Sequence, residues 1–190
     1  RYASRGLGDV YKRQDVVHVK GKNGSGKTTL LRMLIGALHP SEGNIEYNHI
    51  DINRTRFEYL SNLVYVGHKV ALKSSLTALE NLAWISGRDK KCESLIKALE
   101  DMGLSEKKNV LCSELSVGQQ RKLTLARILV SDAKIWLLDE PFNTLDSDGF
   151  TLLKDLIEAH KNNQGLVVYA SHQNVSISDV KTIQLEKAIP

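Results

Sequence analysis

The segment at residues 21–28, GKNGSGKT, constrains the fold of this chain more than any other feature. It fits the pattern GxxxxGK[ST], whose glycines let the backbone wrap closely around a phosphate group. The β-branched residues at 15–20 predict a strand before it, and the apolar spacing after it predicts a helix over about 27–37, which His39-Pro40 would end. A strand, a glycine-rich turn and a helix in this order indicate an α/β fold.

The same segment predicts a binding site for a nucleoside triphosphate and Mg²⁺. The backbone N–H groups of the turn and the N-terminus of the helix favour a negatively charged phosphate. Lys27 is predicted to reach the β- and γ-phosphates, and the hydroxyl of Thr28 to ligate Mg²⁺. The residues that we predict to bind the nucleotide are Gly21, Lys22, Asn23, Gly24, Ser25, Gly26, Lys27, Thr28 and Thr29.

A second polar site is predicted after the apolar run IWLL at residues 135–138. The run shows no alternation, which is typical of a strand in a parallel sheet with both faces covered. It ends in Asp139 and Glu140, so that a stiff strand would hold both carboxylates beside the phosphate-binding turn. We predict that Asp139 takes part with Thr28 in the Mg²⁺ site, and that Glu140 orients or deprotonates the attacking water.

The middle of the chain differs in character from both ends. Residues 69–120 contain helix formers and few strand signals. The sequence TALE that begins at Thr77 is a capping-box pattern, which predicts a helix that starts there. An amphipathic helix with the sequence CESLIKALEDMG is predicted to end at Gly103. Further apolar strands are predicted at 62–66, NLVYV, and within 165–172, GLVVYASH.

Composition and charge narrow the classes of function. The 190 residues are 42% hydrophobic and 25% charged, as in an ordinary globular protein, and no apolar run approaches the roughly 18 residues needed to cross a bilayer. Most of the formal net charge of +4 lies within residues 1–14, so we predict no nucleic-acid binding by the rest of the chain. Cys92 and Cys112 form no CxxC pair, which is typical of a reducing compartment.

The sequence LSVGQ at residues 115–119, considered together with these patterns, indicates a resemblance to a known family. Taken alone, it predicts a well-capped helix that follows Ser116. Taken with the phosphate loop, the acidic strand end, PFNTLD at 141–146 and His172 after the next strand, it resembles the signature motif of ABC (ATP-binding cassette) ATPases, whose usual form is LSGGQ. The motifs stand in the family's order and cover essentially all of residues 15–190.

The resemblance implies a fold and a mechanism. The fold is a P-loop NTPase (RecA-like) parallel-sheet core at residues 15–67 and 121–190, with the family's helical subdomain inserted at about 69–120. In the mechanism, two copies form a head-to-tail homodimer, and each ATP lies between one copy's phosphate loop and the other's signature helix. Hydrolysis of this ATP would drive ABC membrane subunits, and the chain would be a peripheral protein at the cytoplasmic face of the inner membrane.

The resemblance also assigns roles to single residues. It makes Glu140, His172 and His68 catalytic, and it places Asp146 in the D-loop. The signature residues that would act on the partner's ATP are Ser116, Val117, Gly118 and Gln119. The family grips a cytoplasmic helix of its membrane subunit beside the first helix of the insert, so we expect docking or core positions at Leu76, Leu79, Leu82 and Trp84.

Two positions depart from the general family pattern. Val117 stands where the signature has a glycine, a change that the first turn of a helix tolerates. His68 stands where most ABC ATPases have a glutamine that senses Mg²⁺ and the attacking water. With YVGHK, LTALENL, DEPFNTLD and SHQ, the chain resembles the haem-exporter branch of the family, which serves cytochrome c maturation and commonly has histidine there. This resemblance implies haem-linked transport, although no haem-attachment motif is present.

Residues 1–14 do not fit the family pattern. They stand where the family has strands and an aromatic residue that stacks on adenine, and they show no matching strand pattern. One possible coding sequence for residues 4–14 is that of an adapter used in transposase-based DNA library preparation. We interpret residues 1–14 as a non-native segment read from that adapter, and we expect the native N-terminal strands to be missing. The alternatives are an adenine-stacking Tyr2 or Tyr11 and a transit peptide.

Three other functions compete with this interpretation. The first is the ATPase of another small ABC transporter with a different cargo. The second is an ABC ATPase of the DNA-repair type, whose motifs are split by a long coiled coil, whereas only residues 69–114 separate His68 from the signature here. The third is a non-catalytic nucleotide-binding module, which the intact Lys27, Asp139, Glu140 and His172 disfavour.

Overall fold

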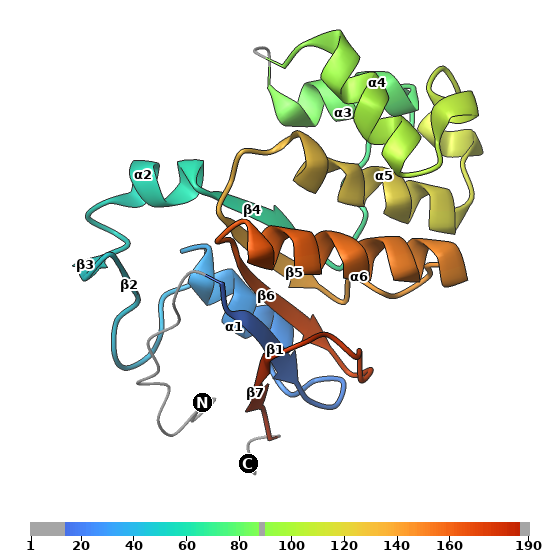
Figure 1. Cartoon of the computed structure of the whole chain (residues 1–190). Helices are drawn as coiled ribbons and strands as arrows, with labels where there is room; N and C mark the ends of the chain where they lie inside the picture. The colour runs from blue at the N-terminus through green and yellow to red at the C-terminus, as the bar shows by residue number, and fades with distance from the viewer. Residues whose placement is uncertain (1–13, 88–89, 187–190) are drawn as a thin grey trace. The chain divides into compact units, whose positions relative to one another are not determined.

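The computed structural model describes residues 14–87 and 90–186, which form two compact units (Figure 1). Among the described residues, the first unit comprises 14–68, 133–141 and 157–186, and the second comprises 69–132 and 142–156. The segment that we interpret as adapter-derived lies outside the described residues, except for Gln14.

A five-stranded parallel sheet forms the centre of the first unit. Its spatial order is β4-β5-β6-β1-β7, and its strands are β1 (Val16–Lys20), β4 (Leu63–Val66), β5 (Ile135–Asp139), β6 (Leu166–Ser171) and β7 (Val180–Gln184). Every residue of β5 is buried, which agrees with its unbroken apolar sequence. The predicted parallel α/β class is therefore confirmed. Because the strands are parallel, the residues that follow β1, β4, β5 and β6 meet at one edge of the sheet.

Helix α1 (Lys27–Leu34) follows β1 and packs against β5 and β6. The prediction that it runs to residue 37 and is ended by His39-Pro40 is wrong. Gly36 has a φ of 68°, and the two N–H groups after it bond back to the carbonyl oxygen of Arg32. A glycine in the left-handed conformation ends a helix in this way because the last carbonyls find partners outside the helical ladder.

A hairpin and a short helix connect α1 to β4. The hairpin pairs β2 (Glu46–Tyr47) with β3 (Ile50–Asp51), and α2 (Arg56–Ser61) follows it. Tyr59 of α2 is buried and donates a hydrogen bond of 2.7 Å to the carbonyl oxygen of Leu34, and burial raises its pKa to about 12. This bond fastens α2 to the end of α1. One hydrophobic cluster in the core of the unit consists of Val17, Val19, Leu31, Ile52, Tyr59, Ile135, Leu137, Val168 and Ala170.

Helices form most of the second unit. Its helices α3 (Ala78–Ser86), α4 (Cys92–Asp101) and α5 (Val117–Val130) contact one another, and two 3₁₀ turns, Ser105–Lys107 and Cys112–Glu114, lie between α4 and α5 in sequence. Because α5 packs against both α3 and α4, the unit extends beyond the predicted boundary at residue 120 to residue 132, and it also takes in 142–156. These residues were expected in the core.

The local signals of the second unit are confirmed. Thr77 Oγ1 accepts a hydrogen bond of 3.2 Å from the Glu80 N–H, and Ser116 Oγ accepts one of 3.2 Å from the Gln119 N–H, so both predicted capping boxes are present. Gly103, with a φ of 68°, follows the end of α4.

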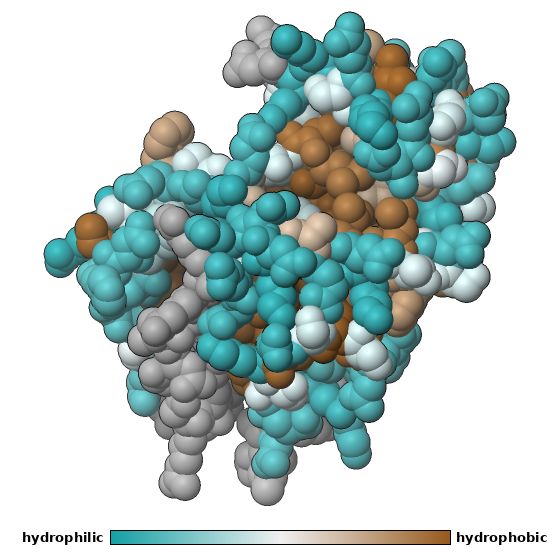
Figure 2. Space-filling view, viewed as in Figure 1, coloured by the Kyte–Doolittle hydropathy of each residue, from teal (hydrophilic) through white to brown (hydrophobic). Residues whose placement is uncertain are grey.

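The last helix, α6 (Ser147–Asn162), has residues in both units. The carboxylate of Asp146 accepts the N–H of Gly149 at 2.9 Å, so this aspartate caps the start of α6. Hydrophilic residues cover much of the face drawn in Figure 2, and a hydrophobic area lies over the region of α5. Among the described residues, the exposed large hydrophobic side chains are Leu38, Ile50, Phe57, Leu60, Trp84, Leu111 and Val117.

Candidate active site

The turn between β1 and α1 has the backbone shape that phosphate binding requires. Gly24 and Gly26 have φ values of 81° and 96°, in the left-handed region that favours glycine. A Cβ at Gly21 would collide with the side chain of Ser25 and would lie 2.9 Å from the carbonyl oxygen of Leu185. The glycines of the motif are therefore needed for the turn itself, which brings the backbone to the N-terminus of α1.

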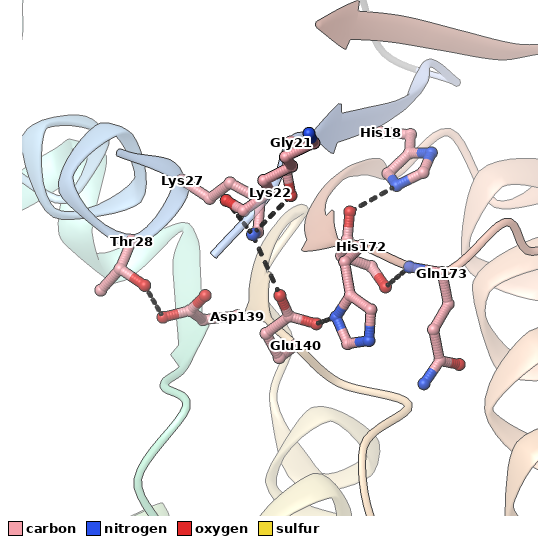
Figure 3. Close-up of polar contacts among 10 residues, drawn as sticks. His18, Gly21, Lys22, Lys27, Thr28, Asp139, Glu140, His172 and Gln173 are labelled. Atoms are coloured by element: carbon pink, nitrogen blue, oxygen red, sulfur yellow. Dashed lines mark hydrogen bonds and ion pairs between the residues drawn. The ribbon is translucent and has the colours of Figure 1, made fainter. Parts of the chain in front are cut away.

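Lys27 is held inside this turn. Its side chain is only 6% exposed, and its ammonium donates to the carbonyl oxygens of Gly21 at 2.8 Å and Lys22 at 3.3 Å. The same nitrogen lies 3.3 Å from Oε1 of Glu140 (Figure 3). The loop thus places a buried positive charge where an incoming phosphate would meet it.

Thr28 and Asp139 are brought together from α1 and β5. The Thr28 hydroxyl donates a hydrogen bond of 2.8 Å to Oδ2 of Asp139, and the aspartate is fully buried. A hydroxyl and a carboxylate are the hard oxygen ligands that Mg²⁺ prefers, and Mg²⁺ usually takes few protein ligands together with phosphate and water. The two residues fit that ion, and the described residues contain no cluster of three or more His, Cys, Asp or Glu that could hold a metal alone.

Glu140 connects the phosphate loop to the end of β6. It is 7% exposed and has a φ of 48°, and its N–H donates a hydrogen bond of 2.8 Å to the carbonyl oxygen of Ala170. This left-handed conformation turns the chain sharply as it leaves β5. As a result, one carboxylate oxygen faces Lys27, and the other lies 3.1 Å from Nδ1 of His172. A strained conformation of this kind is common at functional sites.

His172 lies just past the end of β6, at the sheet edge that carries Glu140. Its side chain is 46% exposed, so the imidazole contacts both the buried carboxylate of Glu140 and the solvent. The residues that we predicted from separate motifs thus form two groups held by hydrogen bonds and ion pairs, Thr28 with Asp139, and Glu140 with Lys27 and His172 (Figure 3).

The sequence patterns did not indicate His18, which also belongs to this region. It lies in β1, is buried, and its Nε2 is 3.1 Å from the carbonyl oxygen of Ser171. Its ring stacks on that of Tyr169, with centroids 4.6 Å apart. Burial lowers the pKa of His18 and raises that of Tyr169 to about 12. The available signal was a lone polar residue inside the apolar run VVHV, directly before the phosphate loop.

His68 follows β4 at the same edge of the sheet. β4 pairs with β5 in a register that sets Val66, two residues before His68, opposite Leu138, which directly precedes Asp139. The side chain of His68 is exposed. Its position in the chain suits a sensor at the strand end.

The signature and D-loop residues lie in the second unit. The capping box leaves Ser116 at the start of α5, and Val117 beside it is 62% exposed. A Cβ at Gly118 would approach the carbonyl oxygen of Thr144 to 3.1 Å, which is a tight contact. Asp146 forms an ion pair of 3.0 Å with Lys122, and this partner lowers the pKa of the carboxyl group. The start of α5 therefore exposes Val117 while its next residue packs closely on the loop before α6.

Comparison with known proteins gives consistent results. Residues 10–143 match the family described as ABC transporter. The cytochrome c biogenesis ATP-binding export protein CcmA of Histophilus somni is 38% identical over 179 residues, covering 93% of this chain and 82% of that protein. The protein of the same name from Haemophilus influenzae is 37% identical over 188 residues, covering 97% of this chain and 89% of that protein.

Solved structures share the fold. An ABC transporter ATP-binding protein from Pyrococcus furiosus has a TM-score of 0.80 and 28% identity, and the match covers 92% of this chain and 86% of that one. No helix among the described residues is both long enough and apolar enough to span a membrane. Together with the phosphate loop and the acidic strand end beside it, these matches show that the chain belongs to the ABC transporter family, as one of its ATP-binding ATPase subunits.

Proposed function

We propose that this chain is the ATPase subunit of a haem-exporter-like complex of cytochrome c biogenesis. The observation that supports ATP hydrolysis is the connected set Lys27–Glu140–His172 beside the pair Thr28–Asp139. The name of the two relatives, cytochrome c biogenesis ATP-binding export protein, supports the assignment to that process. Haem as the cargo is the part of the proposal that rests on resemblance alone.

The residues of the first unit would divide the chemistry between them. Lys27, now bonded to loop carbonyls and to Glu140, has the charge and position to bind the β- and γ-phosphates. Thr28 and Asp139 would hold Mg²⁺, which supplies charge neutralisation at the phosphates when it is bound. The remaining phosphate-loop residues, from Gly21 to Thr29, would present their N–H groups to the nucleotide.

Glu140 is the proposed general base. Its Oε2 lies 3.1 Å from the His172 imidazole, which can hold the carboxylate in one orientation while its Oε1 accepts from an attacking water. Binding of phosphate would give Lys27 a stronger anionic partner and so free Oε1 for that water. His68, at the end of the neighbouring strand, is proposed to take the sensor role that a glutamine has in related proteins.

The second unit would act on the ATP of a second copy in a head-to-tail homodimer. Ser116 still has its O–H to donate, because its oxygen is the acceptor in the capping box. The exposed Val117, together with Gly118 and Gln119, places this helix start at the surface, and Asp146 beside it would line the same dimer interface. The N-terminus of α5 adds a partial positive charge for the γ-phosphate.

Membrane subunits are the proposed partners, at the cytoplasmic face of the inner membrane. Among the residues near the start of α3, Leu82 is fully buried, whereas Trp84 is 59% exposed and carries the Lys73 ammonium 3.8 Å above its ring. An exposed tryptophan with a cation on its face suits contact with a partner helix.

Substitution of Glu140 tests this function. The Glu140→Gln variant should still bind ATP, but its rate of ATP hydrolysis should fall by about 10²–10⁴-fold, because the amide cannot accept the proton. ATP should then hold a stable dimer, which size-exclusion chromatography with and without MgATP would detect. Glu100→Gln, an exposed position on α4, is the matched control and should behave as wild type. Wild-type turnover in Glu140→Gln would remove Glu140 from this role.

A further inference from the structure

His18 makes two specific contacts in the core of the first unit, and both are to β6. In the parallel pair of β1 and β6, His18 stands opposite Tyr169, and the two rings stack almost flat, with an interplanar angle of 9°. The Nε2 of His18 lies 3.1 Å from the carbonyl oxygen of Ser171, the residue directly before His172. Figure 3 shows His18 and His172 on either side of this hydrogen bond.

The direction of that hydrogen bond is fixed by its acceptor. A carbonyl oxygen can only accept, so the Nε2 of His18 must carry the hydrogen. Burial lowers the pKa of His18, and Lys20 and Lys27 act in the same direction, whereas the bond to Ser171 and the charge of Glu140 oppose it. The ring is therefore neutral at pH 7, in the tautomer that donates from Nε2.

The hydrogen bond lies one residue from the proposed catalytic pair. Ser171 Oγ accepts the N–H of Gln173 at 3.0 Å, so the backbone on both sides of His172 is fixed by hydrogen bonds. The His172 side chain is 46% exposed, and its Nδ1 lies 3.1 Å from Oε2 of Glu140. The orientation of an exposed ring depends on the backbone that carries it.

We propose that His18 is a positioning residue for hydrolysis: its bond to the Ser171 carbonyl holds the backbone so that Nδ1 of His172 faces Glu140. This inference rests on the proposed function, because it takes His172 and Glu140 as the groups to be positioned. His18 touches neither the nucleotide loop nor the reacting atoms through a hydrogen bond described here. Its loss should therefore lower kcat and leave the KM for ATP nearly unchanged.

The test compares His18→Phe and His18→Gln in the full chain with its transporter partners. Phenylalanine keeps a ring on Tyr169 and lacks the donor, and it should lower kcat by about 10- to 100-fold, the range for a misplaced catalytic group. Glutamine carries an amide N–H the same number of bonds from Cα as Nε2 and should restore most of the kcat. If His18→Phe does not fold, His18→Leu replaces it, and thermal unfolding of each variant verifies the folded fraction.

A matched control separates positioning from stability. His160 also stacks on an aromatic ring, that of Trp136 at 3.7 Å, and also bonds to a backbone carbonyl, that of Lys134 at 3.3 Å. Lys134 precedes β5, at the end of the sheet opposite to Glu140. His160→Phe should therefore leave the kcat of the folded protein unchanged.

A double substitution shows whether His18 acts through His172. The single variant His172→Ala should lower kcat. Adding His18→Phe to it should lower kcat no further, because the positioned group is already absent. Normal turnover in His172→Ala would overturn the proposed function of His172. Each of three results would overturn the positioning role. The first is a loss of kcat in His172→Ala with normal turnover in His18→Phe. The others are an equal further loss in the double variant and failure of His18→Gln to restore kcat.

Discussion

Glu140 has contacts with groups from two other elements at once, and this explains why its backbone departs from an ordinary strand. The left-handed φ of 48° turns its carboxylate between Lys27 and His172 instead of continuing the line of β5. Its neighbour Asp139 keeps the strand conformation and reaches Thr28. Two adjacent carboxylates thus serve different partners because the chain bends between them.

Substitution of His68 tests its proposed role as a sensor. His68→Gln should keep ATPase activity, because an amide offers both a donor and an acceptor, as a neutral imidazole does. His68→Ala removes both, so it should lose transport-coupled ATPase activity while ATP binding stays near the wild-type value. Assays of nucleotide binding and of ATPase activity with and without the membrane subunits measure the two effects. If His68→Ala couples normally, the histidine is only a loop residue.

At the scale of elements, two helices begin with the same device, and this provides an internal comparison. The capping boxes at Thr77 and Ser116 share their reciprocal hydrogen bonds, with side-chain oxygens 3.2 Å from the backbone nitrogens that they accept from, and Thr77 Oγ1 in addition donates a bond of 2.9 Å to Oε2 of Glu80. Thr77→Ala and Ser116→Ala should each lower the free energy of unfolding by about 1 kcal/mol.

Only one of the two caps is proposed to face a nucleotide. Ser116→Ala should also lower the ATPase activity of the dimer, whereas Thr77→Ala should leave the activity per folded molecule unchanged. Urea unfolding and steady-state ATPase assays distinguish the two effects. Equal activity losses in both variants would mean that the start of α5 acts through stability alone.

A half-buried histidine of helix α6, which packs against strand β5, should make stability depend on pH. His160 stacks on Trp136, and burial lowers its pKa from 6.5 to about 4. The unfolded chain takes up this proton at a higher pH than the folded protein. The free energy of unfolding should therefore fall as the pH decreases from about 6.5 to about 4, by at most about 1.4 kcal/mol per pH unit from this group.

The variant His160→Phe keeps the ring and removes the titration. Its free energy of unfolding, measured by urea titration, should decrease less than that of the wild type across this pH range. The carboxylates that titrate in the same range are present in both proteins, so they cancel in the difference. The exposed His39→Gln should follow the wild type. A slope in His160→Phe equal to that of the wild type would contradict the lowered pKa of His160.

The elements that could be predicted from the sequence are those with strong local signals. The apolar runs of β5 and β6, the phosphate loop and both capping boxes depend on neighbouring residues, so their patterns sufficed. The end of α1 was misjudged because Gly36 ends the helix before His39-Pro40 is reached. His18 was missed because its role depends on Tyr169 and Ser171, which only the pairing of β1 with β6 brings beside it.

Across the whole molecule, the motifs that we propose to act in ATP hydrolysis are divided between the two units. Lys27, Thr28, Asp139, Glu140 and His172 belong to the first unit, and the signature helix and Asp146 belong to the second. The predicted boundary between core and helical subdomain, at residue 120, divides α5. In the structure all of α5 belongs to the second unit, because it packs against α3 and α4. In the proposed dimer, the two halves of a complete site come from different copies.

The most direct test of the central claim is the level of c-type cytochromes in a bacterium whose own CcmA is replaced by this chain. Haem-stained gels should show that the wild-type chain restores these cytochromes and that Glu140→Gln, expressed at the same level, does not. Equal restoration by Glu140→Gln would contradict the proposed ATPase role. A wild-type chain that hydrolyses ATP in the assembled complex but leaves the cells without these cytochromes would contradict the proposed role in their biogenesis.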